Sequence, residues 1–302
     1  MLKNNRPLVI FFLLATILLG NCQTSTLKQA TPTGSATSIP TSTVTPTPLV
    51  TSTATLSPTP SLLGCPEIQG KFQRLTLEDK VLGKPLQVII FTPPCYDSKK
   101  TGEYPLLVLL HGQGYTAQQW IDLGVAETAS RLMASGELPP FLIALPQEDY
   151  FLLDITKSAF GPAVIKTLIP RVRQEYATCS TRQCTAIGGI SRGAVWAVYL
   201  GFNNGLEFGS IGVHSMPSNP FPEYYMKDLL LPLPEKPRMY LDSGSSDRYL
   251  PDAKRFESAL TAIHLPHSWI MRNGEHNDAY WRSHVEEYLR WYAAPWKSPR
   301  IQ

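Results

Sequence analysis

Short apolar runs alternate with segments of helical periodicity along most of this chain. The apolar runs predict strands near residues 86–91, 106–110, 141–145, 185–190, 210–214, 238–242 and 268–271. Helical patterns fill most of the intervals, near 125–135, 162–176, 194–202, 251–264 and 278–292, and Pro170 is expected to kink or break the second of them. This alternation predicts an α/β fold with a mostly parallel central sheet and helices on both faces.

The segment 216–237 departs from this alternation, because it is rich in proline and carries Phe221, Tyr224 and Tyr225. It follows a predicted strand. Its aromatic side chains therefore either overhang a site at the sheet edge or bury themselves against the domain. The same two alternatives, pocket lining or helix packing, apply to Tyr115 and Trp120.

The first 61 residues differ from the rest in composition. Lys3 and Arg6 precede an apolar run at 8–19, which is the length of a signal-peptide core and too short for a membrane-spanning helix. The residues up to Cys22 resemble a bacterial lipobox, so residues 1–22 are expected to be a lipoprotein-type signal peptide that ends at a lipidated Cys22. Residues 23–61, nearly all Thr, Ser, Pro and small residues, are expected to be a disordered linker before a single domain at 62–302.

A Gly-Gly-Ile-Ser-Arg-Gly stretch at 188–193 is the strongest chemical signal. It follows a predicted strand and precedes a predicted helix, which is the context that a G-x-S-x-G nucleophile turn needs. Gly189 and Gly193 would leave room for the sharp turn that exposes the hydroxyl of Ser191. A glycine-rich turn that only packs helix on sheet is the simpler alternative.

The expected acid and base follow in the order Ser, Asp, His along the chain. Asp247 and His276 each come after a predicted strand, at the edge where parallel sheets keep their sites, and Asn277 is expected to cap the last helix. The rival acids are Asp242, at a strand end, and Asp252, in the first turn of a helix. Among the other histidines, His214 at a strand end is the main rival, whereas the placement of three more argues against them: His264, His267 and His284.

An oxyanion hole is expected from two main-chain N–H groups, one directly after the nucleophile and one in the loop after an early strand. These are the N–H groups of Arg192 and Gln113. His111, which opens that loop, is expected to order it rather than to take part in the chemistry.

The cysteines other than Cys22 are even in number, which suits disulfides in an exported protein. Three pairings are possible, and the favoured one joins Cys179 to Cys184 and Cys65 to Cys95. Their spacing does not indicate a zinc site. The formal net charge of +3 comes from dispersed Lys and Arg, so no nucleic-acid partner is expected.

From about residue 73 to 292 the chain resembles the putative esterase family, the esterase D-like group of the α/β-hydrolases. The matching pieces are residues 105–114, 185–194, 244–247, 274–276, 280–281 and 288–291. The resemblance implies Ser191 as nucleophile, Asp247 as acid, His276 as base, and Gln113 and Arg192 as main-chain donors. Two departures from the family pattern matter little to catalysis. Ala194 stands where the family often has a second glycine, and Gln113 does not match the signature of one subgroup, which leaves the substrate open.

These observations together predict an exported, membrane-tethered serine carboxylester hydrolase without cofactor or metal. The expected substrates are small-molecule or polysaccharide esters, with carbohydrate or phenolic esters first. An acyltransferase with the same triad, and a surface binding protein on a hydrolase fold, are the alternatives. Besides the substrate, the expected partner is the membrane, through the lipid on Cys22, and the sequence leaves the oligomeric state open.

Overall fold

A computed structural model of the chain describes residues 66–100 and 104–297. The signal peptide, the linker, Cys22 and Cys65 lie outside these residues, so the predictions that concern them remain predictions. None of the helices in the described ranges has the length and apolar character needed to cross a membrane.

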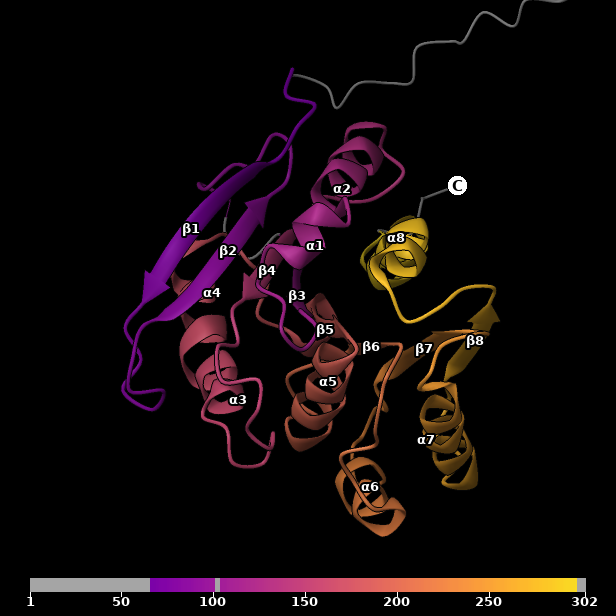
Figure 1. Cartoon of the computed structure of the whole chain (residues 1–302). Coiled ribbons are helices and arrows are strands. Elements are labelled where there is room, and N and C mark those ends of the chain that lie inside the picture. The colour runs from indigo at the N-terminus through magenta and orange to yellow at the C-terminus, as the bar shows by residue number, and fades with distance from the viewer. Residues whose placement is uncertain (1–65, 101–103, 298–302) are drawn as a thin grey trace, which may run out of the picture. The chain divides into compact units, whose positions relative to one another are not determined.

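A mixed sheet of eight strands, in the order β1-β2-β4-β3-β5-β6-β7-β8, forms the centre of the described structure (Figure 1). The strands are β1 (Lys71–Leu77), β2 (Leu86–Thr92), β3 (Leu106–Leu110), β4 (Leu142–Pro146), β5 (Thr185–Ile190), β6 (Ser210–His214), β7 (Arg238–Gly244) and β8 (Ser268–Arg272). All neighbours from β4 across to β8 run parallel, whereas β1 and β2 pair in antiparallel fashion at one edge. The predicted mostly parallel sheet is therefore confirmed.

β1 was not expected from the sequence. Its side chains are mostly exposed, because it is an edge strand that covers little of the core. Such a strand lacks the apolar run by which the buried strands β3 and β5 could be recognised.

Helices cover both faces of the sheet, as predicted (Figure 1). One apolar core lies under α1 (Gln119–Asp122), α2 (Val125–Ala134) and α8 (Asp278–Ala293). The other lies under α3 (Phe160–Ala163), α4 (Ile169–Glu175), α5 (Arg192–Asn203), α6 (Glu223–Leu230) and α7 (Leu250–Ala262). The side chain of Asn277 accepts a hydrogen bond from the Tyr280 N–H, which confirms the expected cap of α8.

The predicted helix at 162–176 is interrupted, as Pro170 indicated. A π-helical turn at Val164–Leu168 separates α3 from α4, and Pro170 lies in the first turn of α4. A proline in a first turn needs no N–H partner, so the wider turn before it accommodates the ring.

The segment 216–237 contains α6, which the proline-rich sequence did not predict. Phe221 is buried and stacks on Tyr199 and Phe202 at ring-centroid distances of 5.5 and 5.8 Å. Tyr224 and Tyr225 are exposed. The aromatic side chains of this segment therefore divide between packing and solvent.

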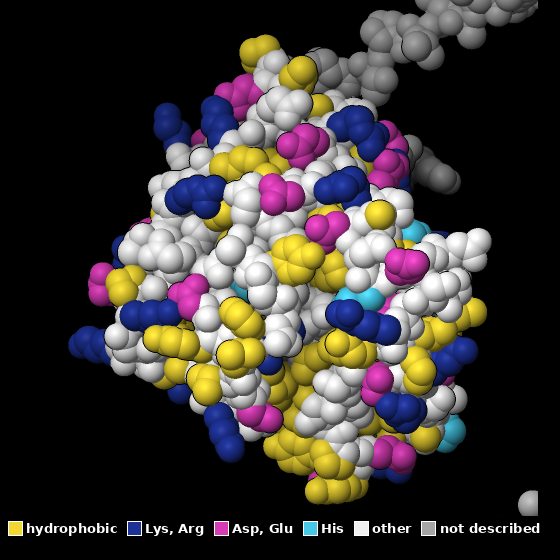
Figure 2. All heavy atoms as spheres, viewed as in Figure 1, with side chains coloured by type: hydrophobic (Ala, Val, Ile, Leu, Met, Phe, Trp, Pro, Cys, Tyr) yellow, Lys and Arg dark blue, Asp and Glu magenta, His cyan; other side chains and the backbone are white. Residues whose placement is uncertain are grey.

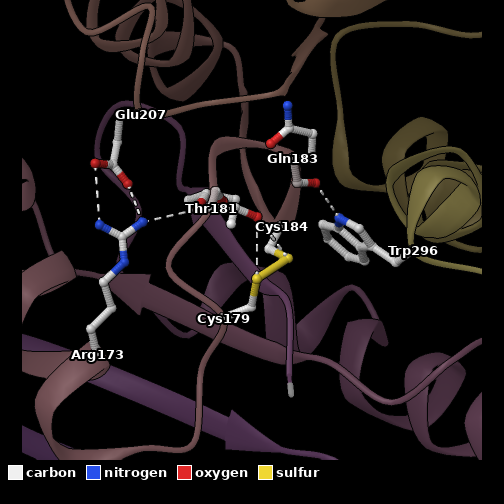
Figure 3. The surroundings of a disulfide bond; sticks show 8 residues. Arg173, Cys179, Thr181, Gln183, Cys184, Glu207 and Trp296 are labelled. Atoms are coloured by element: carbon white, nitrogen blue, oxygen red, sulfur yellow. Dashed lines mark hydrogen bonds and ion pairs between the residues drawn. A yellow bond between two sulfur atoms is a disulfide. The ribbon is translucent and has the colours of Figure 1, made fainter. Parts of the chain in front are cut away.

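The Cys179–Cys184 disulfide is present, as favoured from the sequence (Figure 3). It closes a short loop directly before β5. The Trp296 indole N–H donates to the Gln183 carbonyl at 2.8 Å and ties this loop to the C-terminal end of the described chain. The loop therefore fixes the point where the central strand begins.

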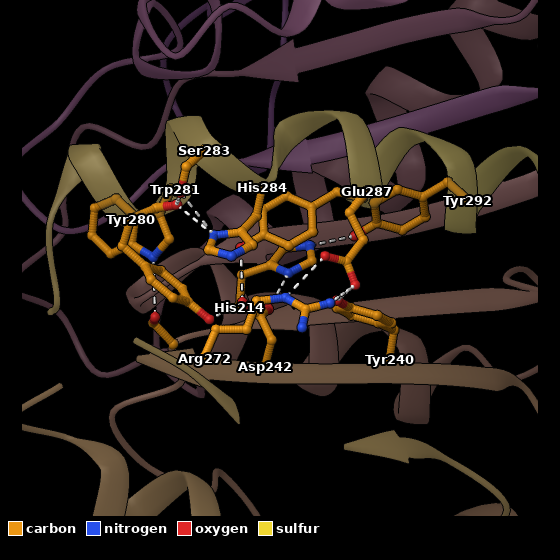
Figure 4. A network of polar contacts seen from close by, with 12 residues as sticks. His214, Tyr240, Asp242, Arg272, Tyr280, Trp281, Ser283, His284, Glu287 and Tyr292 are labelled. Carbon is orange, nitrogen blue, oxygen red and sulfur yellow. Dashed lines mark hydrogen bonds and ion pairs between the residues drawn. The ribbon is translucent and has the colours of Figure 1, made fainter. Parts of the chain in front are cut away.

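A buried polar network joins β6, β7 and α8 (Figure 4). The Asp242 carboxylate accepts hydrogen bonds from the hydroxyls of Tyr280 and Tyr288, both at 2.8 Å, and lies 2.7 Å from His214 Nδ1. His214 Nε2 lies 3.0 Å from the Tyr292 hydroxyl. Burial raises the pKa of Tyr288 well above its usual value, and the nearby Asp242 charge adds to this, so the phenol stays neutral and remains a donor.

Replacing Asp242 with Ala should lower the free energy of unfolding by about 3–5 kcal/mol, because two tyrosine hydroxyls and an imidazole would lose a buried acceptor. Urea unfolding followed by tryptophan fluorescence measures this. Asp252→Ala is the control, since its pairing with the exposed Arg255 should contribute less than about 1 kcal/mol. Equal losses in the two variants would show that the network contributes little.

Replacing Cys179 and Cys184 with Ser should lower the free energy of unfolding by about 2 kcal/mol. Loop-closure entropy for a link between residues five apart in sequence gives this size. The comparison is made in urea under oxidising conditions. Dithiothreitol should lower the stability of the parent more than that of the double variant, and equal losses in the two proteins would contradict the estimate.

Candidate active site

Ser191 lies on a strained turn between β5 and α5. Its φ and ψ are 55° and −119°, a conformation that residues other than glycine rarely adopt. A Cβ on Gly189 would lie 2.2 Å from the carbonyl carbon of Gly193, and one on Gly193 would lie 2.2 Å from the Leu110 carbonyl oxygen. Both glycines are therefore required for the turn to pack against β3, as its sequence indicated.

His276 and Asp247 converge on this turn from the loops that follow β8 and β7. His276 Nε2 lies 2.9 Å from Ser191 Oγ, and His276 Nδ1 lies 2.9 and 3.0 Å from the two Asp247 oxygens. In the tautomer that suits these contacts, Nδ1–H donates to the carboxylate and Nε2 accepts from the hydroxyl. The structure thus brings together the three side chains that the sequence singled out.

The loops that carry Asp247 and His276 contact each other. A Cβ on Gly244, at the end of β7, would lie 2.3 Å from the Gly274 carbonyl oxygen, so the two loops meet backbone to backbone. The Ser246 N–H donates to the same Gly274 oxygen at 2.9 Å. The position of His276 relative to Asp247 is therefore fixed by main-chain contacts as well as by their own hydrogen bonds.

Two aromatic rings enclose the imidazole of His276. Tyr249 and Trp281 each meet it edge-on, at centroid distances of 4.8 and 5.1 Å. The Trp281 indole N–H donates to Ser215 Oγ at 3.0 Å, and the Ser215 hydroxyl is also a hydrogen-bond partner of the Asp247 carboxylate. Ser215 is fully buried and has a positive φ of 53°. Ser215 was not expected from the sequence, although it directly follows His214 at a predicted strand end.

The pKa of Asp247 is lowered from its ordinary value. Burial alone would raise it, but hydrogen bonds from His276, from the Tyr249 N–H and from Ser215, together with the charge of His276, outweigh burial. The Asp247 carboxylate is therefore ionised at neutral pH, where it can accept the hydrogen bond from His276 Nδ1–H.

The other aspartates and histidines considered as acid or base lie in other surroundings. His214 is buried between Asp242 and Tyr292, and so Asp242 also serves the network beneath the site. Asp252 pairs with Arg255 on α7. The remaining histidines considered in the sequence contact other groups: His267 faces Glu257, His284 bonds the Tyr280 carbonyl oxygen, and His264 adopts a positive φ after α7.

The loop after β3 is held in place beside Ser191. His111 is buried; its Nε2 lies 2.9 Å from the Glu148 amide and its Nδ1 lies 2.9 Å from the Gly112 carbonyl oxygen. Burial lowers the pKa of His111, which favours the neutral form that these two contacts require. The buried Gln119 side chain accepts from the Gly112 N–H and donates to Asp278, so the loop is also tied to α8.

Gln113 follows in this loop, and Arg192 is the first residue of α5. Gln113 borders both the pocket that contains Ser191 and a second hollow, and Arg192 borders the second hollow. An N–H in the first turn of a helix has no intrahelical acceptor. Within the described residues, no loop or cap hydrogen bond uses the N–H of Gln113 or of Arg192. The two groups are therefore available to a developing oxyanion.

The side chain of Arg192 holds the loop that follows β4. Its guanidinium forms two hydrogen bonds with the buried Glu148 carboxylate, at 2.7 and 2.8 Å, and a third with the Leu153 carbonyl oxygen at 2.7 Å. Phe151 lies between these two anchor points and lines the pocket. No pattern in the sequence points to Glu148, which lies 44 positions before Arg192.

A pocket of about 410 Å³ opens over Ser191 and His276. Its other walls are aromatic side chains, the loop after β3 and one arginine: Gly112, Gln113, Gly114, Tyr115, Phe151, Arg248, Tyr249 and Trp281. Tyr115 thus lines the pocket, whereas Trp120 is buried and donates to the Leu110 carbonyl oxygen. On the face shown in Figure 2, hydrophobic and charged side chains are mixed, and a histidine lies beside a basic side chain.

A second hollow of about 320 Å³ lies on the other side of Gln113 and Arg192. Residues 217–220 contribute to it, so this part of the proline-rich segment borders the site although its aromatic residues do not. Among the described residues, no group of three or more His, Cys, Asp or Glu side chains is placed to hold a metal ion.

Comparisons with known proteins identify relatives of the domain. A curated relative, the endo-1,4-beta-xylanase/feruloyl esterase of Xylanibacter ruminicola, is 24% identical over 230 residues, which cover 72% of this chain and 31% of that protein. The chain thus spans about a third of the length of that relative.

Solved structures share the fold. A ferulic acid esterase from Anaeromyces mucronatus, in complex with ferulic acid, superposes with a TM-score of 0.65 at 18% identity, covering 76% of this chain and 93% of that one. An S-formylglutathione hydrolase from Staphylococcus aureus gives a TM-score of 0.64 at 16% identity, covering 74% and 99%. These likenesses confirm the predicted α/β-hydrolase fold.

The family described as putative esterase matches residues 80–292, more than half of the chain. This range includes every side chain of the Ser191 pocket. The chain therefore belongs to the putative esterase family and has the α/β-hydrolase fold.

Proposed function

We propose that the chain is an exported, lipid-anchored serine carboxylester hydrolase that acts through Ser191, His276 and Asp247. The observation that carries this proposal is the pair of contacts made by His276, with Nε2 at 2.9 Å from the Ser191 hydroxyl and Nδ1 on the Asp247 carboxylate. A nucleophile, a base and an orienting acid within hydrogen-bonding distance are the arrangement that acyl transfer requires.

In the proposed reaction, Ser191 Oγ attacks the ester carbonyl carbon while His276 Nε2 takes its proton. The N–H groups of Gln113 and Arg192 stabilise the tetrahedral oxyanion. Collapse expels the alcohol, which receives the proton from His276 and leaves the acyl group on Ser191. A water molecule, deprotonated by the same nitrogen, then releases the carboxylic acid and restores the hydroxyl.

The pocket supports an aromatic substrate. Tyr115, Phe151, Tyr249 and Trp281 offer flat apolar surfaces around the nucleophile, which suit offset or edge-on packing with a phenolic ring. The named activities of the relatives, on feruloyl esters and with ferulic acid bound, agree with this chemistry. We therefore place phenolic esters first, including those carried on carbohydrate.

The proposed location rests on the sequence before the catalytic domain. Lys3 and Arg6, the apolar run at 8–19 and Cys22 support export and lipidation, and residues 23–61 would then act as a tether. Metabolic labelling with a palmitate analogue should mark the parent and leave Cys22→Ala unmarked. Equal labelling of both would refute the anchor but leave the esterase proposal intact.

Ser191→Ala should lower kcat/KM for p-nitrophenyl acetate and for methyl ferulate by about 10⁴-fold or more, because the nucleophile itself is removed. The parent should also react with a fluorophosphonate probe at Ser191, as read by mass spectrometry. Ser258→Ala, at an exposed position on α7, is the matched control and should retain full activity and labelling. Equal rates in Ser191→Ala and the parent would overturn the proposal.

Asp247→Asn should reduce the free energy of unfolding at neutral pH, and the difference from the parent should shrink in acid. The folded pKa of Asp247 is lowered, so its ionised form stabilises the native state above its unfolded pKa of about 3.9, and this stabilisation is lost as the pH falls through the folded pKa. Urea unfolding of both proteins between pH 7 and pH 2 measures the difference. A difference that grows toward acid would contradict the assignment.

A further inference from the structure

Arg248 lies in the wall of the Ser191 pocket, directly after the proposed catalytic acid. The Tyr249 N–H donates to the Asp247 carboxylate at 2.8 Å, and the Leu250 N–H donates to the Asp247 carbonyl oxygen at 3.0 Å. These bonds make a tight turn through Arg248. The backbone that carries this side chain is therefore held as firmly as Asp247 itself.

The guanidinium of Arg248 differs from the others in the described structure. Each of the other arginines in the described ranges has a protein oxygen within hydrogen-bonding or ion-pair distance: Arg74, Arg131, Arg171, Arg173, Arg182, Arg192, Arg238, Arg255, Arg272, Arg282 and Arg290. Arg248 instead lies over the ring of Tyr249 at 4.9 Å. Such a contact uses the flat face of the cation and leaves its N–H donors available.

The charge of Arg248 is not balanced by the pocket. Of the described residues that line it, Arg248 alone is a Lys, Arg, Asp or Glu. The acidic side chains on the neighbouring segments have other partners, since Asp247 bonds His276 and Glu275 accepts from Asn277 at 3.2 Å. An anion that entered the pocket would therefore meet an unoccupied cation and no repelling carboxylate.

The distance to the chemistry is short. Arg248 packs on Tyr249, and the Tyr249 ring lies 4.8 Å from the imidazole of His276. The guanidinium is thus one aromatic ring away from the proposed base. The two contacts together bound the separation between the guanidinium and the imidazole centroid at no more than about 10 Å, so a substituent that reaches Arg248 has to extend from the ester carbonyl by a distance of this order.

We propose that this esterase selects substrates that carry a carboxylate on the moiety that occupies the Ser191 pocket, and that Arg248 binds this carboxylate. The inference rests on the proposed esterase function and narrows its substrate class to anionic esters. The guanidinium fork would accept the two carboxylate oxygens in parallel, while Tyr249 holds its plane. Arg248 is on this basis a specificity residue, and the chemical steps stay with Ser191 and His276.

Two pairs of esters test the proposal, each pair differing only in a carboxylate and its neutral amide. Methyl 4-carboxycinnamate and methyl 4-carbamoylcinnamate place the group on the acyl side. Acetates of 4-hydroxybenzoic acid and 4-hydroxybenzamide place it on the alcohol side. The readout is the ratio of kcat/KM for the anionic ester to that for the neutral ester, compared between parent and variants so that intrinsic reactivity cancels.

For the pair whose substituent occupies the pocket, Arg248→Gln should lower this ratio by about tenfold, the size expected for a charge-assisted hydrogen bond at a partly solvated site. Arg248→Lys should retain part of the preference, and Arg248→Glu should reverse it. Arg255→Gln removes the same charge from an exposed position of α7 and should leave the ratio unchanged. In the parent, 0.5 M salt should weaken the preference, because the side chain is exposed.

The outcomes separate the two proposals. Equal ratios in the parent, Arg248→Gln and Arg248→Glu for both pairs, with the esters hydrolysed, would overturn the role of Arg248 and leave the esterase standing. Failure of the folded parent to hydrolyse any of the four esters would count against the proposed function itself. A similar fall in both members of a pair would show that Arg248 only supports the turn after Asp247, which also overturns the inference.

Discussion

The buried carboxylate of Asp242 is the interaction on which the site most depends. It is the hydrogen-bond partner of side chains from β6 and α8, and the main chain next to it holds residues of the site in place. The Ser215 N–H donates to the Asp242 carbonyl oxygen at 2.9 Å, and the Ser191 N–H donates to the His214 carbonyl oxygen at 2.8 Å. Ser191 and Ser215, which supports Asp247, are thus held by one hydrogen-bonded layer, in which a buried charge is stabilised by several hydrogen bonds.

Close backbone approach is the second constraint. The turn at Ser191 fits only because Gly193 allows α5 to meet the end of β3, and the loops of the acid and base meet through Gly244. These contacts leave no space for a Cβ, so the geometry is set by the backbone before any side chain is placed. The strained φ of Ser191 persists because the surrounding sheet and helix determine it.

Much of the fold could be predicted from the sequence, because the buried strands and long helices carry strong periodicity. The turn at Ser191 and the loop positions of Asp247 and His276 could be predicted equally well, since each follows an apolar strand. β1 and α6 were not predicted, because an exposed edge strand and a helix in a proline-rich segment lack that periodicity. The roles of Glu148 and Arg248 could not be foreseen, because Arg192 lies far from Glu148 in sequence and, within the described ranges, the Arg248 guanidinium has an aromatic ring and no oxygen as its partner.

Arg192 combines two duties in one residue. Its main-chain N–H directly follows Ser191 and is proposed to bind the oxyanion, whereas its side chain holds the loop that contains Phe151. Every amino acid except proline supplies this N–H, so mutation in evolution or by design can exchange the side chain together with its loop. The wall of the pocket can then be rebuilt for another ester without disturbing the machinery that cleaves it.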